Sequence, residues 1–360
     1  MAFTATITHP TLYGLMAIRR QFSVSVAPYR LAIGLLVATL VAASCGRPAN
    51  DTLVVYSGRS ENLIAPLLQQ FTEESGIMVE VRYEGSADLA LLIETEADRS
   101  PADVFISQSP GAMGLLAGNG RLQVIDASVL EAVDERFRNA DGLWVGMSGR
   151  VRVIVYNRNM IDPAAIPTSV FDLTDERFRG DVGIAPGNGS FQDFVTGMRQ
   201  VYGDDVALAW LEGMAANDAQ AYAKNSAIVQ AVAAGEVPLG LVNHYYNFRA
   251  QAEDPGIASE NFYLPDGDIG SLVIITAIGI LDASNNADAA SEFVAFMLGE
   301  SAQRFFSQET LEYPLASGAA ASSVLPPLSS VGLTTYDFDR LGDGLERTKE
   351  LINASGLEGP

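Results

Sequence analysis

The order of strand and helix patterns in residues 52–107 constrains the fold more than any other feature of this sequence. Apolar residues here run continuously, alternate with polar ones, or recur at helical spacing, which are the patterns of buried strands, half-buried strands and amphipathic helices. In chain order they predict strand 52–56, a helix that Ser60 caps and Gly76 ends, strand 77–83, helix 87–97 and strand 103–107. This β-α-β-α-β order predicts a parallel sheet with right-handed crossovers.

A second run of strands and helices begins after Pro167. The long extended stretch Val145–Asn157 leads into it, and the apolar stretch Leu272–Leu281 leads back towards the first run. We therefore expect an α/β fold with two lobes, each a mostly parallel sheet flanked by helices, and a ligand cleft between them. The predicted lobes are residues 52–150 with about 276–326, and about 151–275 with about 327–360.

The first 44 residues have the pattern of an export signal. Three arginines precede or flank the uncharged run Leu31–Ser44, which is too short to span a bilayer comfortably, and Cys45 follows at once. The residues before this cysteine resemble a bacterial lipobox. We predict a lipoprotein-type signal over 1–44, lipidation of Cys45 and a tether over 45–51; the alternative is an ordinary signal peptide with an incidental cysteine. The protein is expected in the periplasm or on the outer face of the cytoplasmic membrane.

The charge balance excludes one large class of partners. Acidic residues outnumber basic ones 44 to 22, a formal net charge of −22, whereas nucleic-acid-binding proteins need a basic surface that replaces phosphate counterions. One cysteine rules out an internal disulfide and a cysteine-rich metal centre, and two histidines leave little room for histidine metal chemistry. We expect a monomer with no nucleic-acid partner.

Four loops leave the carboxyl ends of predicted strands, which is where α/β sheets bind ligands. They are residues 57–61, 107–109, 186–191 and 243–246. Each carries oxygen donors or hydrogen-bond donors, but none combines a nucleophile, a histidine and an acid, and the chain has no hydrolase, zinc-protease or P-loop motif. We therefore expect a protein that is not an enzyme; a secreted hydrolase, which would have to use His244, is kept as an alternative.

Tyr245 and Tyr246 are the most distinctive pair in these loops. Two adjacent phenols at a strand end can both lean into a cleft if the backbone turns there. Phenolate is a hard oxygen donor, and with a usual pKa near 10 it needs a strong cation such as Fe(III) nearby to ionise at neutral pH. From the residues alone, the pair indicates either a ferric site or two tyrosines of the core or the surface.

Several groups that could hold an anion lie in the same loops. The glycine-bearing turn Pro186–Phe191 precedes a predicted helix, and such a turn exposes backbone N–H groups to an anion. Asn225 and Asn243 offer side-chain amides of the same kind. An anion bound to them would fill the remaining coordination positions of a metal, and the alternative is that they only cap helices and shape turns.

The segments Val55–Arg59, Ser100–Phe105, Pro186–Phe191, Lys224–Ser226 and Asn243–Tyr246 occur in this order. Together they resemble the ferric-ion-binding proteins, which are substrate-binding components of bacterial iron ABC transporters with the type II periplasmic-binding-protein fold. The resemblance covers about residues 51–320. It implies an ABC permease as partner and Fe(III) as cargo. It also implies that Fe(III) is bound by Tyr245 and Tyr246, and a synergistic carbonate or phosphate by Asn188, Gly189, Ser190, Asn225 and Asn243.

The sequence departs from the family's pattern at the other ligand positions. The best-known members have a histidine in the first loop and a glutamate after the third strand, where this chain has Ser60 and Gln108. Some relatives have a further tyrosine near the anion loop, where Phe191 and Gln192 stand here. An anion or water is therefore expected to complete the coordination. Further candidate metal or anion contacts, each with a structural alternative, are Arg59, Glu61, Gln108 and Tyr156.

A different ligand on the same fold is the main alternative. Arg59 and the glycine-bearing turn could hold an oxyanion, a phosphonate or a small carboxylate, with the two tyrosines only stacking against it. His244 is expected to be a neighbour of the site and not a ligand, because its side chain diverges from that of Tyr245 on most turns.

Overall fold

The computed structural model describes residues 52–108, 110–265, 267–331 and 344–357. The predicted signal over 1–44, the lipidation site Cys45 and the tether over 45–51 lie outside the described residues, as do parts of the predicted second lobe. The chain divides into two units after Ala49, and all the described residues belong to the second. In the part of the chain that the structure describes, no helix has the length and apolar character needed to cross a membrane.

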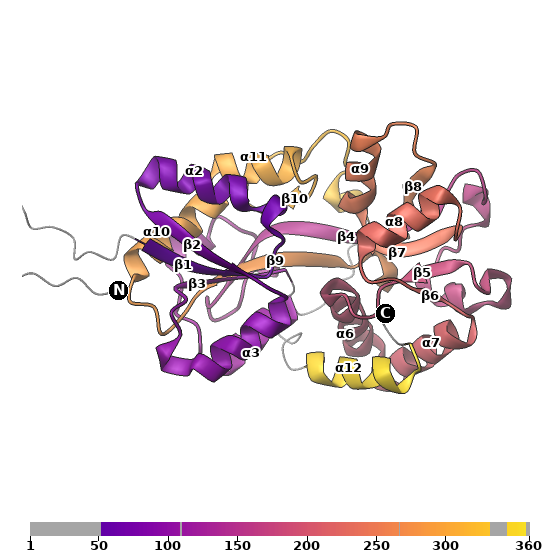
Figure 1. Cartoon of the computed structure of the whole chain (residues 1–360), viewed down its shortest axis with the longest axis horizontal. Helices are drawn as coiled ribbons and strands as arrows, with labels where there is room; N and C mark the ends of the chain where they lie inside the picture. The colour runs from indigo at the N-terminus through magenta and orange to yellow at the C-terminus, as the bar shows by residue number, and fades with distance from the viewer. Residues whose placement is uncertain (1–51, 109, 266, 332–343, 358–360) are drawn as a thin grey trace, which may run out of the picture. The chain divides into compact units, whose positions relative to one another are not determined.

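One path of hydrogen-bonded strands runs through this unit (Figure 1). Its order is β2-β1-β3-β9-β4-β7-β5-β6, with β8 and β10 also paired to β4. The strands are β1 (Thr52–Ser57), β2 (Met78–Tyr83), β3 (Val104–Ser107), β4 (Val145–Asn157), β5 (Val182–Ile184), β6 (Gln220–Ala221), β7 (Leu239–Asn243), β8 (Ser259–Phe262), β9 (Val273–Ile280) and β10 (Tyr313–Pro314). Strands β2, β1 and β3 are parallel, as are β7, β5 and β6, while β9 and β4 pair antiparallel between the two groups.

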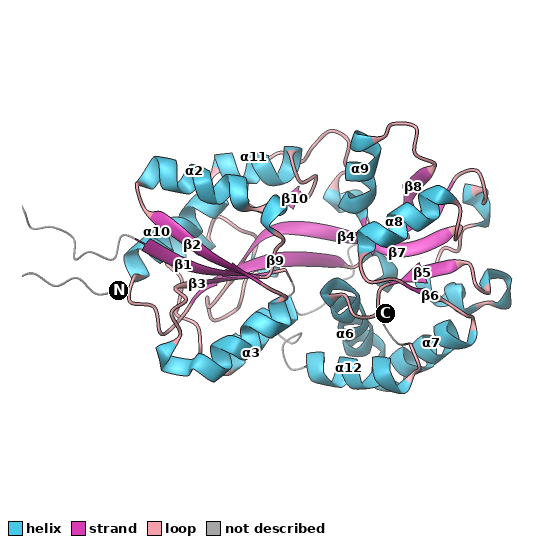
Figure 2. Ribbon diagram, in the orientation of Figure 1, coloured by secondary structure: helices cyan, strands magenta, loops and turns pink. Residues whose placement is uncertain are grey.

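Helices pack on the two groups of strands separately (Figure 2). In this view α2 and α11 lie above β1–β3 with α3 below them, whereas α8 and α9 lie above β7 and β5 with α6, α7 and α12 below. The helices are α2 (Ala65–Ser75), α3 (Ser86–Glu96), α4 (Pro110–Gly118), α5 (Ala127–Leu130), α6 (Gly189–Tyr202), α7 (Asp204–Ala216), α8 (Asn225–Ala234), α9 (His244–Glu253), α10 (Ala287–Leu298), α11 (Glu300–Gln308) and α12 (Leu345–Ala354). The predicted α/β class and the parallel β-α-β-α-β start are confirmed.

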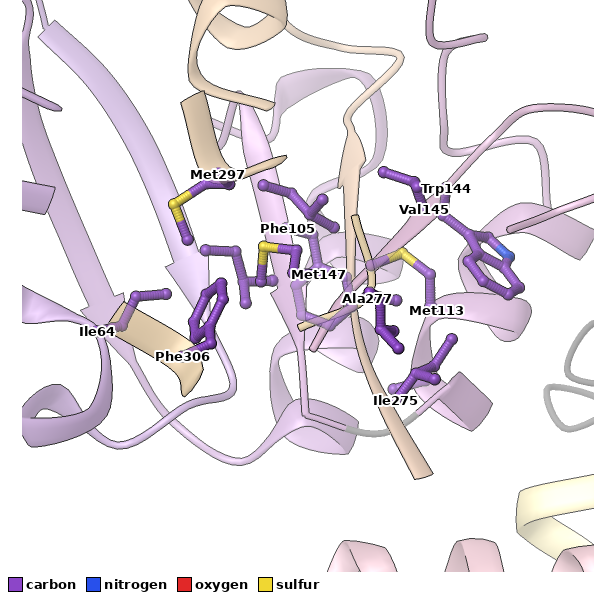
Figure 3. Packing of buried hydrophobic residues seen from close by; sticks show 14 of the residues in the cluster. Ile64, Phe105, Met113, Trp144, Val145, Met147, Ile275, Ala277, Met297 and Phe306 are labelled. Carbon is purple, nitrogen blue, oxygen red and sulfur yellow. The ribbon is translucent and has the colours of Figure 1, made fainter. Parts of the chain in front are cut away.

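The buried hydrophobic residues form two cores, and the first also contains residues of the second group of strands, among them Val242 of β7 and Ile228 of α8. Figure 3 shows the first, in which Phe105 of β3, Met147 of β4 and Phe306 of α11 pack together. The second contains Ile154 of β4 and Ile274 of β9. Strands β4 and β9 thus belong to both cores, because successive side chains of a strand point to opposite faces. The lobe boundaries predicted above stay a prediction.

A close approach between α8 and β7 fixes the position of two predicted site residues. A Cβ on Gly240 would lie 2.2 Å from Cγ2 of Ile228, so only glycine lets the helix sit this close to the strand. Asn225 begins α8 and Asn243 ends β7. The missing side chain at Gly240 therefore brings the two elements that carry these amides together.

Candidate functional site

The two adjacent tyrosines lie in the first turn of α9, directly after β7 ends at Asn243. Their ring centroids are 4.1 Å apart and the planes are tilted by 30°. Tyr245 is fully buried, and its hydroxyl has no hydrogen-bond partner of good geometry among the described residues. Burial raises the pKa of Tyr245 well above its usual value, and the neighbouring Tyr246 phenol adds to the shift. The pair thus contains a buried phenol oxygen, that of Tyr245, which is available to bind a ligand.

Four of the five predicted anion-binding residues form one hydrogen-bonded network. The side-chain oxygen of Asn188 accepts from the Ser190 backbone N–H at 3.1 Å, from the Ser190 hydroxyl at 2.7 Å and from the Asn225 amide at 3.3 Å. The Asn243 amide donates to the Ser190 hydroxyl at 3.1 Å. Gly189 stands between the first two, as the first residue of α6. We call these residues, Asn188, Gly189, Ser190, Asn225 and Asn243, the amide network.

Arg152 is the residue of this region that the sequence analysis missed. It lies opposite Asn243 in the antiparallel pairing of β4 with β7, and only 1% of it is exposed. Its Nη1 donates to Asn243 Oδ1 at 3.3 Å and to Asn225 Oδ1 at 3.5 Å, whereas its Nε and Nη2 have no partner among the described residues. Burial lowers the pKa of Arg152 to about 9, partly offset by the Tyr246 phenol. A buried cation with free donors therefore contacts the amide network and interacts electrostatically with Tyr246.

A second buried group of charges lies next to Tyr245. Arg59 is fully buried, and its Nη1 contacts Glu312 at 3.1 Å and the Thr276 hydroxyl at 2.9 Å. Burial alone would raise the pKa of Glu312, but Arg59 and Arg150 bring it below its usual value, so the carboxylate is ionised. The Nε and Nη2 of Arg59 have no partner in the described part of the chain. Arg59 is thus an ion-pair partner that still has donors free for an anion.

Arg150 differs from Arg152 and Arg59 because its Nε and Nη2 donate to backbone carbonyls, and only its Nη1 has no partner among the described residues. Its Nη2 donates to the carbonyls of Gln108 and Ile275, the latter at 3.1 Å, and its Nε donates to the carbonyl of Ile274 at 3.4 Å. These bonds connect β4 to β9 and to the end of β3. Arg150 therefore holds the site's walls in place.

The three remaining candidates, Gln108, Glu61 and Tyr156, lie in different surroundings. Gln108 lines a cavity beside the amide network, and its N–H donates to the Ser86 hydroxyl at 3.0 Å. Glu61 is exposed, and its charge adds to the rise that burial causes in the pKa of Tyr83. Tyr156 lies away from the amide network, because it pairs with Leu239, which is at the opposite end of β7 from Asn243.

Tyr156 and His244 have structural partners instead. The Tyr156 hydroxyl donates to Glu260 Oε2 at 2.8 Å, and burial together with this carboxylate raises the pKa of Tyr156 to about 12. The Nδ1 of His244 accepts from the Val151 N–H at 3.1 Å, and its Nε2 donates to the Leu311 carbonyl at 3.0 Å. Burial lowers the pKa of His244 to about 4. A neutral histidine with both nitrogens bonded is a neighbour of the tyrosines, not a metal ligand.

The donor set around the tyrosines is made of phenol, amide, hydroxyl and guanidinium groups. Among the described residues, no group of three or more His, Cys, Asp or Glu could hold a metal ion. The cavity next to the amide network has a volume of about 350 Å³, and its walls include Gly58, Gln108 and Ser190. The arrangement can bind a hard cation through phenol oxygens and an anion through N–H groups, side by side.

Known proteins share this sequence and fold. Residues 99–341 match the family of bacterial extracellular solute-binding proteins. The chain is 31% identical to the Fe(3+)-binding periplasmic protein of Serratia marcescens, over 86% of this chain and 91% of that protein. It is 32% identical to the major ferric iron-binding protein of Neisseria meningitidis serogroup B, over 90% and 98%. The crystal structure of iron-bound HitA from Pseudomonas aeruginosa superposes with a TM-score of 0.82 at 30% identity, covering 85% of this chain and 99% of that one.

The fold and the match over most of the body define a bacterial extracellular solute-binding protein, which is a binding protein and not an enzyme. Within this class the chain belongs to the ferric-ion-binding protein family, with the type II periplasmic-binding-protein fold. The family resemblance inferred from the five sequence segments is therefore confirmed, and the hydrolase alternative is not.

Proposed function

We propose that this protein captures Fe(III) through Tyr245 and Tyr246 and delivers it to the permease of an ABC transporter. The observation that carries the proposal is the pair of close phenols at the start of α9, one of them fully buried with an unpartnered hydroxyl. The relatives named as ferric-iron-binding proteins support the choice of Fe(III) as cargo.

The charges around the tyrosines support a ferric ion bound with a synergistic anion. Two phenolates neutralise only part of a trivalent charge, so a further anionic ligand stabilises the complex. The amide network offers N–H donors for carbonate or phosphate, and the free Nε and Nη2 of Arg152 add a positive charge there. Arg59 and Gln108 complete the proposed surroundings, whereas Glu61 and Tyr156 have no part in them.

Delivery to a permease requires the protein to lie outside the cytoplasm. We propose export through the signal over residues 1–44 and attachment to the membrane through a lipidated Cys45, with residues 45–51 as tether. The apolar run before Cys45 and the small residues next to it support this part of the proposal. The protein would bind its cargo as a monomer.

Absorption spectroscopy with metal analysis tests the proposed cargo. Purified protein given Fe(III) from a weak chelator in bicarbonate buffer is expected to bind one iron per chain and to gain a visible band from tyrosinate-to-Fe(III) charge transfer. A colourless, iron-free protein would contradict the proposal. It would then favour a small oxyanion or carboxylate as the ligand, since Arg59 and Arg152 both have free donors.

Iron binding is expected to release protons. The raised pKa of Tyr245 means that its phenol is protonated at neutral pH in the iron-free protein, and a metal ion binds the phenolate form. The affinity for Fe(III) should therefore fall as the pH is lowered from 8 to 5, because protons compete for the same oxygens. Calorimetry in buffers of different ionisation enthalpy measures the protons released, and no net release at pH 7.5 would exclude tyrosine ligands.

A further inference from the structure

The helix that carries the two tyrosines begins without a side-chain cap. Asn243 is the residue before α9, and its side chain makes no capping hydrogen bond to that helix. It instead donates to the Ser190 hydroxyl at 3.1 Å and accepts from Arg152 at 3.3 Å. Helix ends fray, and a capping side chain is the usual means of holding the first turn. Other contacts are therefore needed to hold the turn that carries the phenols.

His244, the first residue of α9, supplies such a contact to strand β4. Strand β7 ends at Asn243, which pairs with Arg152, so the next residue of β4, Val151, lies beyond the last paired residue of β7. The His244 Nδ1 accepts the Val151 N–H at 3.1 Å. Val151 is fully buried, and a buried N–H without an acceptor lowers stability. The imidazole thus continues the pairing of β4 where β7 stops.

The other nitrogen of the ring bonds to the segment between α11 and β10. Nε2 of His244 donates to the Leu311 carbonyl at 3.0 Å. Leu311 has a φ of 56°, in the left-handed region that leucine rarely adopts. The next residue, Glu312, is held by Arg59 at 3.2 Å and by the Ser148 hydroxyl at 2.7 Å. A strained backbone persists only where its surroundings hold it, so the Leu311 carbonyl is a firmly placed acceptor.

We propose that His244 is a positioning residue of the cargo site, which fixes the first turn of α9 so that the phenols of Tyr245 and Tyr246 are held side by side before a metal binds. Both of its nitrogens are engaged, so it acts through the tyrosines and contacts neither the metal nor the anion. Ligands that are ordered before binding lose less conformational freedom when the metal arrives. This inference rests on the Fe(III) function proposed above and adds a residue to that site.

Three variants of His244 test the proposal. His244→Leu removes both hydrogen bonds, His244→Asn keeps an acceptor near the place of Nδ1, and His244→Gln keeps a donor near the place of Nε2. Fe(III) affinity is measured by competition with a chelator in bicarbonate buffer. His244→Leu is expected to lower it about 10–100-fold, as loss of a group that orients a metal's ligands does, and to shift the tyrosinate-to-Fe(III) band of the complex. His244→Asn and His244→Gln should each restore part of the affinity.

Asn217→Leu is the control for a loss of stability alone. Asn217 lies directly after α7, is buried, and donates to the carbonyls of Leu173 at 3.1 Å and Asp175 at 2.8 Å. This variant also loses two hydrogen bonds between a side chain and the backbone. It should therefore lower the midpoint of thermal unfolding as His244→Leu does, but leave the iron affinity and the visible band unchanged.

The outcomes separate this proposal from the function on which it rests. If His244→Leu only loses stability, with the affinity and the band of the unchanged protein, the positioning proposal is wrong and the ferric function stands. If His244→Leu does not fold, the same two readouts on His244→Asn and His244→Gln decide, and unchanged values in both overturn the proposal. If the unchanged protein binds no Fe(III), both proposals fail.

Discussion

Replacing both Tyr245 and Tyr246 with phenylalanine is expected to lower the affinity for Fe(III) at least about a thousandfold, which corresponds to about 4 kcal/mol. The change removes the two proposed anionic ligands, and one of them, Tyr245, is fully buried. The visible charge-transfer band should disappear with the binding. The fold should survive, because the Tyr245 hydroxyl makes no hydrogen bond that the substitution could break.

Tyr156→Phe is the matched control for this double variant. It deletes the same atom from a buried tyrosine, but that hydroxyl donates to Glu260 at 2.8 Å, away from the amide network. We expect unchanged iron affinity and a loss of stability of about 1 kcal/mol, seen as a lower midpoint of thermal unfolding. Iron affinity retained in the double variant, or lost in the control, would refute the assignment of the ligands.

Arg152→Met is expected to weaken Fe(III) binding about 10–100-fold when bicarbonate or phosphate is present, as loss of a group that positions a metal's ligands does. The substitution removes the free Nε and Nη2 donors but keeps most of the side-chain volume. The effect should shrink when both anions are depleted. Titrations of the variant and the unchanged protein at several anion concentrations measure this difference.

Arg150→Met is the comparison variant, because it is expected to lower stability more than Arg152→Met does. Arg150 donates to carbonyls of Gln108, Ile274 and Ile275, so its loss leaves buried acceptors unpaired and should destabilise the protein by about 2–4 kcal/mol. Arg152→Met should cost less stability, because two of its donors are already unpartnered. An Arg152→Met effect on iron affinity that does not depend on the anion would show that this residue only supports the fold.

Local patterns explain why much of the fold could be predicted. The first three strands and the helices between them are set by periodicity within short windows, and β1, α2, β2, α3 and β3 lie close to the predicted ranges. The amide network could be predicted in part for the same reason. Asn188 precedes α6, Asn225 begins α8 and Asn243 ends β7, which are the positions where α/β sheets bind ligands.

Strand register explains what the sequence could not show. Arg152 reaches the amide network because β4 pairs antiparallel with β7, which puts Arg152 opposite Asn243 and Tyr156 opposite Leu239. No local pattern contains that register, so the sequence favours Tyr156 as a candidate and gives no reason to choose Arg152. A charged residue within a strand that is buried along its whole length was the available signal. The Glu312 partner of Arg59 lies far along the chain and left no comparable signal.

The sharing of β4 and β9 by both cores has a mechanical consequence. Strand β9 pairs with β3, β9 pairs with β4, and β4 pairs with β7, so the path of paired strands from one group to the other passes through these two strands. Arg150 and Arg152 both lie on β4. A ligand held by Arg152 would therefore be held by the strand pair through which the two groups are connected.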